Sequence, residues 1–349
     1  MHYLVTGHTG FKGAWLVAWL HSLGHQVSGL ALDPVPGALY SRARLDEFMH
    51  VDARCDVRDA AATARVLQRV RPDVVVHLAA QPLVRESYRD PRGTWETNVL
   101  GTFNVLDAVR TVTDVKAQLV ITTDKVYRNV NQIRGYRESD ALGGDDPYSA
   151  SKAAADLLTQ SWITSTENRP PTAIARAGNV IGGGDVCADR LMVDLVAACS
   201  RGEHARLRFP QAVRPWQHVL DCLAGYLSIL DHLLTSEVGD GQAYNIGPGA
   251  DAFVTVEEVA RTVAELWGVP GEPALSTDTH PAEAGLLALD ARKAELTLGW
   301  RSVLSFRDAL SWTVDWEKDV LAGRDPQETT LSQFAEFRVR AEPGRRASS

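Results

Sequence analysis

Cysteine is scarce in this sequence, and the cysteines that are present form no recognisable pattern. Cys55, Cys187, Cys199 and Cys222 are scattered along 349 residues, with no Cys-x-x-Cys pair and no histidine at zinc-finger spacing. A disulfide framework or a structural zinc site would need such spacing. The thiols are therefore expected to be reduced and buried, as in a cytoplasmic protein, and no metal site is predicted.

Long apolar runs and broad basic surfaces are lacking too. No uncharged apolar run reaches about 18 residues, the rough length of a membrane-spanning helix, and the start of the chain shows no basic segment or cleavage site of a secretory signal. Acidic residues outnumber basic ones, 44 to 36, and the basic residues gather only from Arg338 to Arg346. We interpret this end as a frayed, solvated tail. Neither a nucleic acid nor a membrane is expected as a partner, and a cytoplasmic location is expected.

The first half of the chain alternates short apolar runs with longer segments of helical spacing. Strands are predicted at 3–6, 26–32, 74–79, 119–122 and 172–176, and helices at 15–23, 61–69 and 95–111. Strands that are apolar on both faces and separated by helices indicate a parallel sheet covered on both sides. The predicted fold class is α/β, a Rossmann-type doubly wound sheet that binds ligands at the carboxyl ends of its strands.

Three glycines lie three residues apart between the first predicted strand and the helix that follows it. Residues 5–13 read VTGHTGFKG. Glycines in this position let a pyrophosphate approach the backbone and lie on exposed amides at a helix N-terminus. We predict a dinucleotide-binding turn whose cofactor-binding residues are Gly7, Thr9, Gly10, Phe11, Lys12 and Gly13.

An acidic residue follows the second predicted strand. Asp33 is placed where a carboxylate can accept hydrogen bonds from both hydroxyls of an adenosine ribose and would repel a 2′-phosphate. NAD is therefore favoured over NADP; a solvated aspartate at a strand end is the simpler alternative. Asp56 and Val57, after the next strand, are predicted neighbours of the adenine.

Beyond Asn179 the alternation becomes irregular. Helices are predicted at 190–201, 220–234 and 255–268, the last with Thr255 as its cap, and a short strand at 206–209. We assign residues 1–178, with 213–245 returning to them, to an NAD-binding Rossmann domain. Residues 179–212 and 246–323 are assigned to a smaller, interwoven α/β lobe that binds the substrate, and 324–349 to a C-terminal tail.

Tyr148 and Lys152 share one face of a predicted helix at i, i+4. A phenol has a pKa of about 10, and ionising it near neutral pH takes roughly 4 kcal/mol. The Lys152 ammonium and an oxidised nicotinamide could together supply this, so that the tyrosinate takes a hydroxyl proton while the same carbon loses hydride. Thr123, at the end of a strand, could hydrogen-bond to that hydroxyl, or could simply satisfy backbone groups.

These motifs resemble those of the extended short-chain dehydrogenase/reductase family of nucleotide-sugar enzymes, and within it the group of CDP-D-glucose 4,6-dehydratases. The resemblance extends to about Gly323. Val186 and Val193 depart from it, since Trp and Pro are typical there, beside the nucleotide pocket. The motifs are residues 5–13, 77–85 (HLAAQPLVR), 122–127 (TTDKVY), 136–138 with Gly143 and Gly144, 146–152 (DPYSASK), 214–219 (RPWQHV), His280-Pro281, Glu283-Ala284 and 298–300 (LGW).

The resemblance implies a hydro-lyase with tightly bound NAD that converts CDP-glucose to CDP-4-keto-6-deoxyglucose. Tyr148 would deprotonate the 4-hydroxyl as NAD⁺ takes the C4 hydride, water would leave from C5 and C6, and the hydride would return to C6. Asp124 would be the acid for the departing hydroxyl and Lys125 the base at C5, where sibling enzymes carry Asp-Glu. A lysine base must be neutral. A structural ion pair of Asp124 with Lys125 therefore remains the alternative.

The same resemblance assigns further ligand-binding residues. It also implies a homodimer formed through the helices at 95–111 and 148–162. For NAD it adds Leu78, Ala79, Ala80, Asn98 and Thr122 to Tyr148 and Lys152, and for the nucleotide sugar it implies Gln81, Arg85, Asn179, Arg190 and Arg214. The arginines suit a diphosphate because a guanidinium can bind it with two parallel hydrogen bonds.

Two other functions remain open at this level. An epimerase or decarboxylase acting on a nucleotide sugar would share the C4 oxidation but needs neither Asp124 nor Lys125. A non-catalytic dinucleotide-sensing protein could use the same fold, yet it need not retain Tyr148 and Lys152 together. His218 is interpreted as a core or positioning residue and not as a catalyst.

Overall fold

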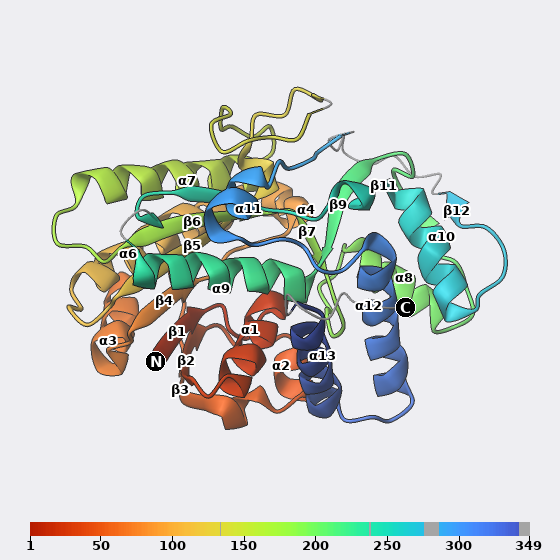
Figure 1. The fold of residues 1–349 in the computed structure, drawn as a ribbon, viewed down its shortest axis with the longest axis horizontal. Coiled ribbons are helices and arrows are strands. Elements are labelled where there is room, and N and C mark those ends of the chain that lie inside the picture. The colour runs from red at the N-terminus through yellow and green to blue at the C-terminus, as the bar shows by residue number, and fades with distance from the viewer. Residues whose placement is uncertain (133, 237–238, 276–285, 342–349) are drawn as a thin grey trace.

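The computed structural model describes residues 1–349 except 133, 237–238, 276–285 and 342–349 (Figure 1). The motif residues His280, Pro281, Glu283 and Ala284 lie outside the described residues, as do Arg345 and Arg346 of the basic end. No helix within the described ranges is long and apolar enough to cross a membrane.

The centre of the fold is a seven-stranded parallel sheet, which confirms the predicted class. Its order is β10-β6-β5-β4-β1-β2-β3. The chain therefore runs outward in one direction through β2 and β3, then restarts at β4 on the other side of β1. The carboxyl ends of β1 and β4 flank this switch point, where doubly wound sheets bind ligands. The strands are β1 (His2–Thr6), β2 (Gln26–Ala31), β3 (Met49–Arg54), β4 (Val74–His77), β5 (Ala117–Thr123), β6 (Thr172–Ala177) and β10 (Ala243–Ile246).

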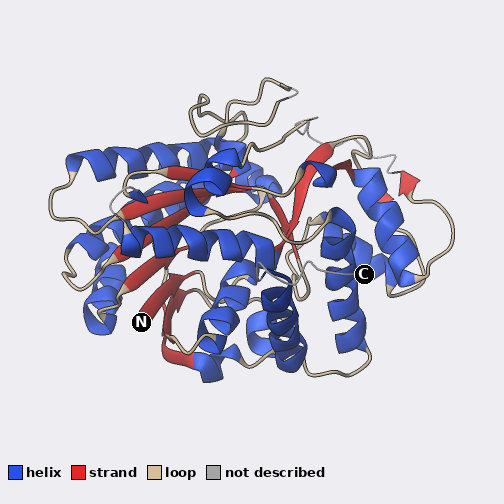
Figure 2. Cartoon of the chain, viewed as in Figure 1, coloured by secondary structure: helices blue, strands red, loops and turns tan. Residues whose placement is uncertain are grey.

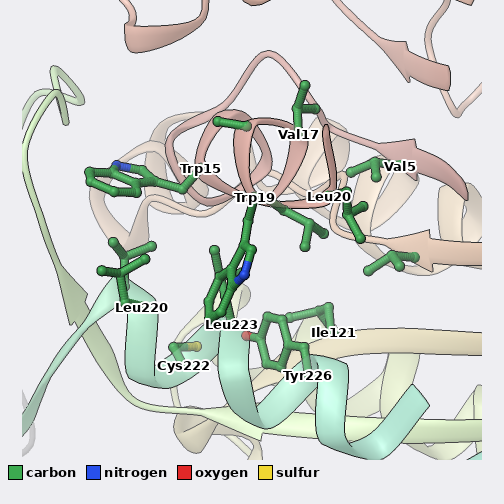
Figure 3. Packing of buried hydrophobic residues seen from close by; sticks show 14 of the residues in the cluster. Val5, Trp15, Val17, Trp19, Leu20, Ile121, Leu220, Cys222, Leu223 and Tyr226 are labelled. Carbon is green, nitrogen blue, oxygen red and sulfur yellow. The ribbon is translucent and has the colours of Figure 1, made fainter. Parts of the chain in front are cut away.

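Helices cover both faces of this sheet because its side chains alternate between two apolar layers. Leu4 and Val75 pack with α3 (Ala60–Val70) and α6 (Gly101–Arg110). Figure 3 shows the opposite layer, where Leu223 and Tyr226 of α9 (Val219–Thr235) lie between Trp19 of α1 (Phe11–Ser22) and Ile121 of β5. The helix α7 (Pro147–Ser165) packs beside α6 and β5.

The helix predicted at 95–111 is interrupted. The chain forms α4 (Val84–Arg89) and α5 (Pro91–Trp95), then a π-helical turn η2 (Glu96–Leu100), and only then α6. Such turns rotate the residues that follow relative to a regular helix and recur at functional sites. Here the turn carries Thr97 and Asn98, and no apolar periodicity in the sequence predicted it.

A second lobe is built from the segments after β6. The strands β7 (Asn179–Ile181), β9 (Val213–His218) and β11 (Phe253–Thr255) form a three-stranded sheet, and β8 (Arg206–Leu207) pairs with β12 (Ala274–Leu275). The helices α8 (Leu191–Cys199), α10 (Val256–Trp267) and α12 (Phe306–Leu321) share one apolar cluster. Figure 2 shows these helices gathered at one side of the molecule. The side chain of Thr255 caps α10, as predicted.

Residues 324–349 were assigned to a C-terminal tail whose basic end, from Arg338 to Arg346, was expected to be frayed. The expected fraying is wrong from Arg338 to Ala341, which are helical. Residues Pro326–Ala341 form α13, which lies beside α1 (Figure 1). Phe334 and Phe337 are buried against Trp15 and Trp19. Phe334 and Phe337 are spaced for one face of a helix, but the expectation was based on the basic residues of this end alone.

Shorter elements complete the described chain. They are α2 (Leu39–Arg42), η1 (Leu45–Phe48), η3 (Asp124–Val126), η5 (Ala250–Ala252) and α11 (Arg292–Leu298). His218 is fully buried and caps α9 through its ring nitrogen, which accepts from the Leu220 amide at 3.3 Å. This place agrees with the interpretation of His218 as a core or positioning residue; that it is not a catalyst stays a prediction.

Candidate active site

The glycine turn has the geometry that close contact with a phosphate needs. Gly7 has a φ of +71°, in the left-handed region that favours glycine. A Cβ atom on Gly13 would lie 2.2 Å from the carbonyl oxygen of Gly7, so no larger residue fits. The helix α1 begins at Phe11, and Gly10 before it provides no side-chain cap. Its first amides are therefore open to an anion.

This turn forms one wall of a cleft of about 260 Å³ at the carboxyl ends of the central strands. The predicted ligand-binding residues that line it are Gly7, Thr9, Gly10, Phe11, Lys12, Gly13, Asp56, Val57, Leu78, Ala79, Ala80 and Arg190. The sequence analysis missed Ala31, Leu32, Cys55, Arg58, Pro82, Thr97 and Cys187. Those at strand ends could have been found from the strand order, whereas Thr97 and Cys187 come from segments whose paths no local pattern predicted.

The cleft fits a dinucleotide. The glycine turn supplies close backbone for a pyrophosphate, apolar residues such as Leu32 and Val57 supply walls for a base, and Arg58, Lys12 and Arg190 supply positive charge. Lys12 donates a hydrogen bond to the Tyr226 hydroxyl at 3.1 Å. Burial lowers the pKa of this lysine, which an approaching anion would oppose.

Asp33 is not among the residues that line the cleft. Its side chain is 88% exposed, and its carboxylate lies 3.5 Å from Nε of Arg54. The more enclosed acidic residue nearby is Asp52, whose carboxylate accepts hydrogen bonds from Tyr40 and Arg54 and contacts the His8 ring. The role of Asp33 as the ribose ligand stays a prediction.

Three other predicted ligand residues have side chains that are engaged with the protein. Asn98 donates to Ser151 Oγ at 2.9 Å and accepts from the Gln81 amide at 2.8 Å. The Gln81 side chain donates to Thr94 at 2.8 Å. Thr122 donates to Asp156 at 3.1 Å. These bonds fix the backbone around the cleft, and direct ligand contacts of Gln81, Asn98 and Thr122 stay predictions.

The predicted catalytic side chains come from β5 and from the first turns of α7, which packs on it. At the end of β5, Thr123 donates to Asp124 Oδ1 at 2.9 Å. Nζ of Lys125 lies 6.0 Å from the centroid of the Tyr148 ring. Lys152 reaches back to the strand and donates to the carbonyl oxygen of Ile121 at 2.8 Å. The end of β5 with the turn that follows it, and the start of α7, are adjacent in space and therefore bring the predicted catalytic side chains together.

Burial has the largest effect on the pKa of the Asp124 carboxyl. The residue is 1% exposed, and this raises the pKa of its carboxyl, although Lys125, Thr123 and Arg214 each act to lower it. Its Oδ2 has no hydrogen-bond partner within the described part of the chain. Burial and the charge of Lys125 therefore act on the pKa of this carboxyl in opposite directions, and burial has the larger effect.

Tyr148 and Lys152 are also buried. Burial raises the pKa of Tyr148 to about 12, and the groups that lower it are Thr123 and Arg190 rather than Lys152. The Lys152 amine is hydrogen-bonded to the Ile121 carbonyl. That the Lys152 ammonium acts on the phenol together with an oxidised nicotinamide stays a prediction. Burial lowers the pKa of Lys152 to about 7, with the charge of Lys12 acting in the same direction.

The low pKa of Lys152 predicts a pH-dependent stability. Between about pH 7 and 10.5 the unfolded chain holds a proton on this amine that the folded chain has lost, so the free energy of unfolding rises with pH in this window. Lys152→Met should therefore be most stable relative to the wild type below pH 7, and its advantage should shrink towards pH 10.5. Urea titrations across this range measure it. The exposed Lys116→Met is the control, and a difference that is independent of pH would contradict the prediction.

Two predicted substrate residues, Arg85 and Arg190, form ion pairs in the loop that connects β7 to α8. Arg85 of α4 pairs with Asp189 at 2.8 Å, and Arg190 pairs with Asp185 at 2.6 Å. Of these arginines, only Arg190 lines the cleft. Asn179 begins β7.

Arg214 is buried in β9, where it donates to the Val213 carbonyl at 2.9 Å and acts on Asp124 through its charge. Gly178 was missed by the sequence analysis. A Cβ atom there would lie 2.7 Å from Pro215 and 3.3 Å from Asp124 Oδ2, so glycine is required where β6 passes Asp124. No sequence signal distinguished this glycine. Among the described residues, no group of three or more His, Cys, Asp or Glu could hold a metal ion.

A doubly wound sheet with a glycine turn, a Tyr/Lys pair on one helix and an irregular second lobe defines an extended short-chain dehydrogenase/reductase. Residues 4–313 match the family described as GDP-mannose 4,6 dehydratase. The chain belongs to this family.

Curated relatives of the chain include 4,6-dehydratases acting on two nucleotide sugars. The CDP-glucose 4,6-dehydratase of Salmonella typhimurium is 40% identical over 331 residues, which cover 92% of this chain and 91% of the relative. The dTDP-glucose 4,6-dehydratase of Xanthomonas campestris pv. campestris is 30% identical, with 90% and 92% covered.

Solved structures of related enzymes have the same fold. The crystal structure of DesIV, a dTDP-glucose 4,6-dehydratase from Streptomyces venezuelae with NAD and TYD bound, is 27% identical with a TM-score of 0.78, covering 94% of this chain and 100% of that one. A UDP-glucose 4-epimerase from Thermus thermophilus, in complex with NAD, is 26% identical with a TM-score of 0.79, covering 91% and 99%.

Proposed function

We propose that this protein is an NAD-dependent CDP-glucose 4,6-dehydratase, a hydro-lyase that forms CDP-4-keto-6-deoxyglucose. The observation that carries this proposal is the buried Asp124 at the end of β5. Its pKa is raised by burial, and one of its oxygens has no partner among the described residues, beside Thr123 and in the electrostatic reach of Tyr148. A carboxyl whose pKa is raised keeps its proton to a higher pH and can give that proton to a departing hydroxyl.

The cofactor would be held by the glycine turn and the cleft around it. When bound, the cofactor would supply the acceptor for the substrate's C4 hydride in its oxidised form and the donor for its return to C6 in its reduced form. The chain supplies backbone amides of α1 for the pyrophosphate, and Lys12 and Arg190 for its charge. Retention of the cofactor between turnovers stays a prediction, which the nucleotide absorbance of the purified protein tests.

Each proton transfer of the proposed reaction would be carried out by a different side chain. Tyr148 would accept the proton of the 4-hydroxyl, with Thr123 hydrogen-bonded to the same group. The pKa of about 12 means that the phenol needs added positive charge before it can do so, and Arg190 already acts in this direction. Once a ketone stands at C4, Lys125 would remove the C5 proton and Asp124 would protonate the 6-hydroxyl as it leaves.

The relatives support the choice of substrate. The 40% identity to a CDP-glucose enzyme exceeds the 30% identity to a dTDP-glucose enzyme over similar lengths. Arg190 in the cleft and Arg214 near Asp124 are candidates for the diphosphate. An epimerase reaction has no departing hydroxyl to protonate and so needs no acid at this strand end. The presence of Asp124 therefore argues against an epimerase.

An assay with four nucleotide sugars tests the proposal. The purified protein, supplied with NAD⁺, is incubated with CDP-, dTDP-, UDP- and GDP-linked glucose, and the alkaline absorbance of a 4-keto-6-deoxy sugar is followed. We expect product from CDP-glucose at the highest kcat/KM. No ketone from any of the four would end the dehydratase proposal, and a change of configuration at C4 alone would identify an epimerase.

We further propose that the chain forms a homodimer in the cytoplasm. Large apolar side chains remain exposed on the neighbouring helices α5, α6 and α7 and on the turn between α5 and α6: Trp95, Leu100, Phe103 and Leu157. Exposed apolar patches of this kind mark protein interfaces. A second copy would bury them in the arrangement that the family resemblance implies.

If the proposed dimer forms, a charge at Leu157, which is 53% exposed, should weaken it. Leu157→Asp should raise the dissociation constant by about tenfold or more, because a charge would be desolvated in the contact. Light scattering after size exclusion measures the mass over a dilution series. The matched control is Leu296→Asp, on α11 and 86% exposed, which should leave the mass unchanged. Equal effects of both variants would contradict this interface.

A further inference from the structure

The turn that carries Asp124 and Lys125 is anchored at both of its ends. At its entry, Thr122 donates a hydrogen bond to Asp156 Oδ2 at 3.1 Å. At its exit, the Tyr127 hydroxyl donates to Asn245 at 2.6 Å. Both anchor residues are buried, so that neither exchanges its partner for bulk water.

The two anchors meet at one buried ion pair. Arg176 of β6 donates from Nε and Nη2 to the two carboxylate oxygens of Asp156, each at 2.8 Å, and the side chains are 1% and 0% exposed. Nη1 of the same arginine donates to the Tyr127 hydroxyl at 3.0 Å. Thr122 and Arg176 are also direct partners in the pairing of β5 with β6.

The remaining hydrogen-bonding groups of this network are satisfied as well. Nη1 of Arg176 also donates to the Glu138 carbonyl at 3.1 Å. The Asn245 amide donates to the Tyr136 carbonyl at 2.7 Å and its backbone N–H donates to the Glu138 carboxylate at 2.7 Å. A buried ion pair adds little net stability, but with complete hydrogen bonding it admits only one arrangement of its neighbours.

Asp156 links this network to the hydride-transfer groups. It lies on α7 one helical turn beyond Lys152, on the face that also presents Tyr148. The network therefore connects the helix that carries Tyr148 to the turn that carries Asp124 and Lys125. Within the described part of the chain, none of its members lines the cofactor cleft, and Asp156 acts on Lys152 through its charge.

We propose that Arg176, Asp156 and Tyr127 are positioning residues that hold Asp124 and Lys125 in register with Tyr148 for the elimination of water. This inference rests on the proposed dehydratase function. It assigns the network to the elimination, because Asp124 and Lys125 lie on the anchored turn, whereas Thr123 is held by the pairing of β5 with β6 and Tyr148 by α7.

Tyr127→Phe tests this assignment, since it removes the exit anchor and keeps the ring. In a single turnover of the NAD⁺-loaded variant with CDP-glucose, reduced nicotinamide should appear at the wild-type rate. It should then disappear about 10- to 100-fold more slowly, the loss expected when reacting groups are misplaced by an ångström or less. KM for CDP-glucose and the affinity for NAD⁺ should stay near wild type while kcat falls.

The matched control is Tyr136→Phe. Its ring stacks on that of Tyr127 at 5.3 Å, but its hydroxyl bonds to Asn129 and to the Val130 amide, outside the network. Both phases should stay near wild type in this variant. Asn245→Ala removes the acceptor of the Tyr127 hydroxyl and should also slow the second phase, which keeps the test decisive if Tyr127→Phe does not fold.

The outcomes separate the two proposals. If the wild type forms no ketone from any nucleotide sugar, the proposed function fails. If the wild type forms it and the anchor variants lose both phases equally, or match Tyr136→Phe, then only the positioning role of the network is overturned.

Discussion

Tyr148→Phe should lower kcat by roughly 10²- to 10⁴-fold, the usual contribution of a positioned acid or base. The variant keeps the ring that fills the buried site but has no proton to exchange with the substrate. No reduced nicotinamide should appear when CDP-glucose is added, because the C4 hydroxyl then stays protonated. Equilibrium dialysis should show NAD⁺ binding near that of the wild type.

Tyr3→Phe is the matched control for this variant. Tyr3 is 3% exposed, and burial raises its pKa to about 12, as for Tyr148. It lies in β1 near the amino ends of the strands, at the edge of the sheet opposite to the cleft. Its loss should leave turnover unchanged. A Tyr148→Phe enzyme as active as Tyr3→Phe would remove Tyr148 from the proposed chemistry.

Asp124→Asn should separate oxidation from elimination. The amide preserves the shape of the side chain but has no acidic proton for the departing hydroxyl, so formation of the 4-keto-6-deoxy product should fall by roughly 10²-fold or more. Reduced nicotinamide should still appear on mixing with CDP-glucose, in contrast to Tyr148→Phe. Because burial disfavours the ionised carboxylate, the variant should be no less stable than the wild type at neutral pH.

Asp221→Asn provides the comparison for a buried carboxyl outside the cleft. Asp221 is 1% exposed, burial raises its pKa to about 6, and it accepts from the amides of Val303 and Leu304. This variant should lose stability through those contacts and keep both phases of the reaction. An Asp124→Asn enzyme that forms product at the wild-type rate would show that the proton comes from elsewhere.

The parallel sheet could be predicted from the sequence because its central strands are apolar on both faces. The β5 strand was predicted too short at both ends, since Gln118 and Thr123 are polar yet buried. The π-helical turn at Glu96–Leu100 and the packing of α13 could not be predicted, because both depend on contacts with distant segments. Periodicity reports which side of an element is apolar but not what covers it.

In the candidate site too, features set by local sequence could be predicted, and features set by contacts between distant segments could not. The glycine turn and the grouping of Asp124 with Tyr148 could be predicted, because each lies at the junction of a strand and a helix in one sheet. The partner of Lys152 could not, since the choice between Tyr148 and the Ile121 carbonyl depends on how far α7 lies from β5. Gly178 was missed because its requirement comes from Pro215 and Asp124 across the fold.

The most direct test follows the hydrogen atoms in a complete turnover. CDP-glucose that carries deuterium at C4 is converted by the wild-type enzyme in ordinary water, and the product is examined by nuclear magnetic resonance. The account predicts deuterium at C6 of the 4-keto-6-deoxy sugar, because the hydride taken from C4 is returned there. Deuterium that is retained at C4, or lost to the solvent with hydrogen from water at C6, would contradict it.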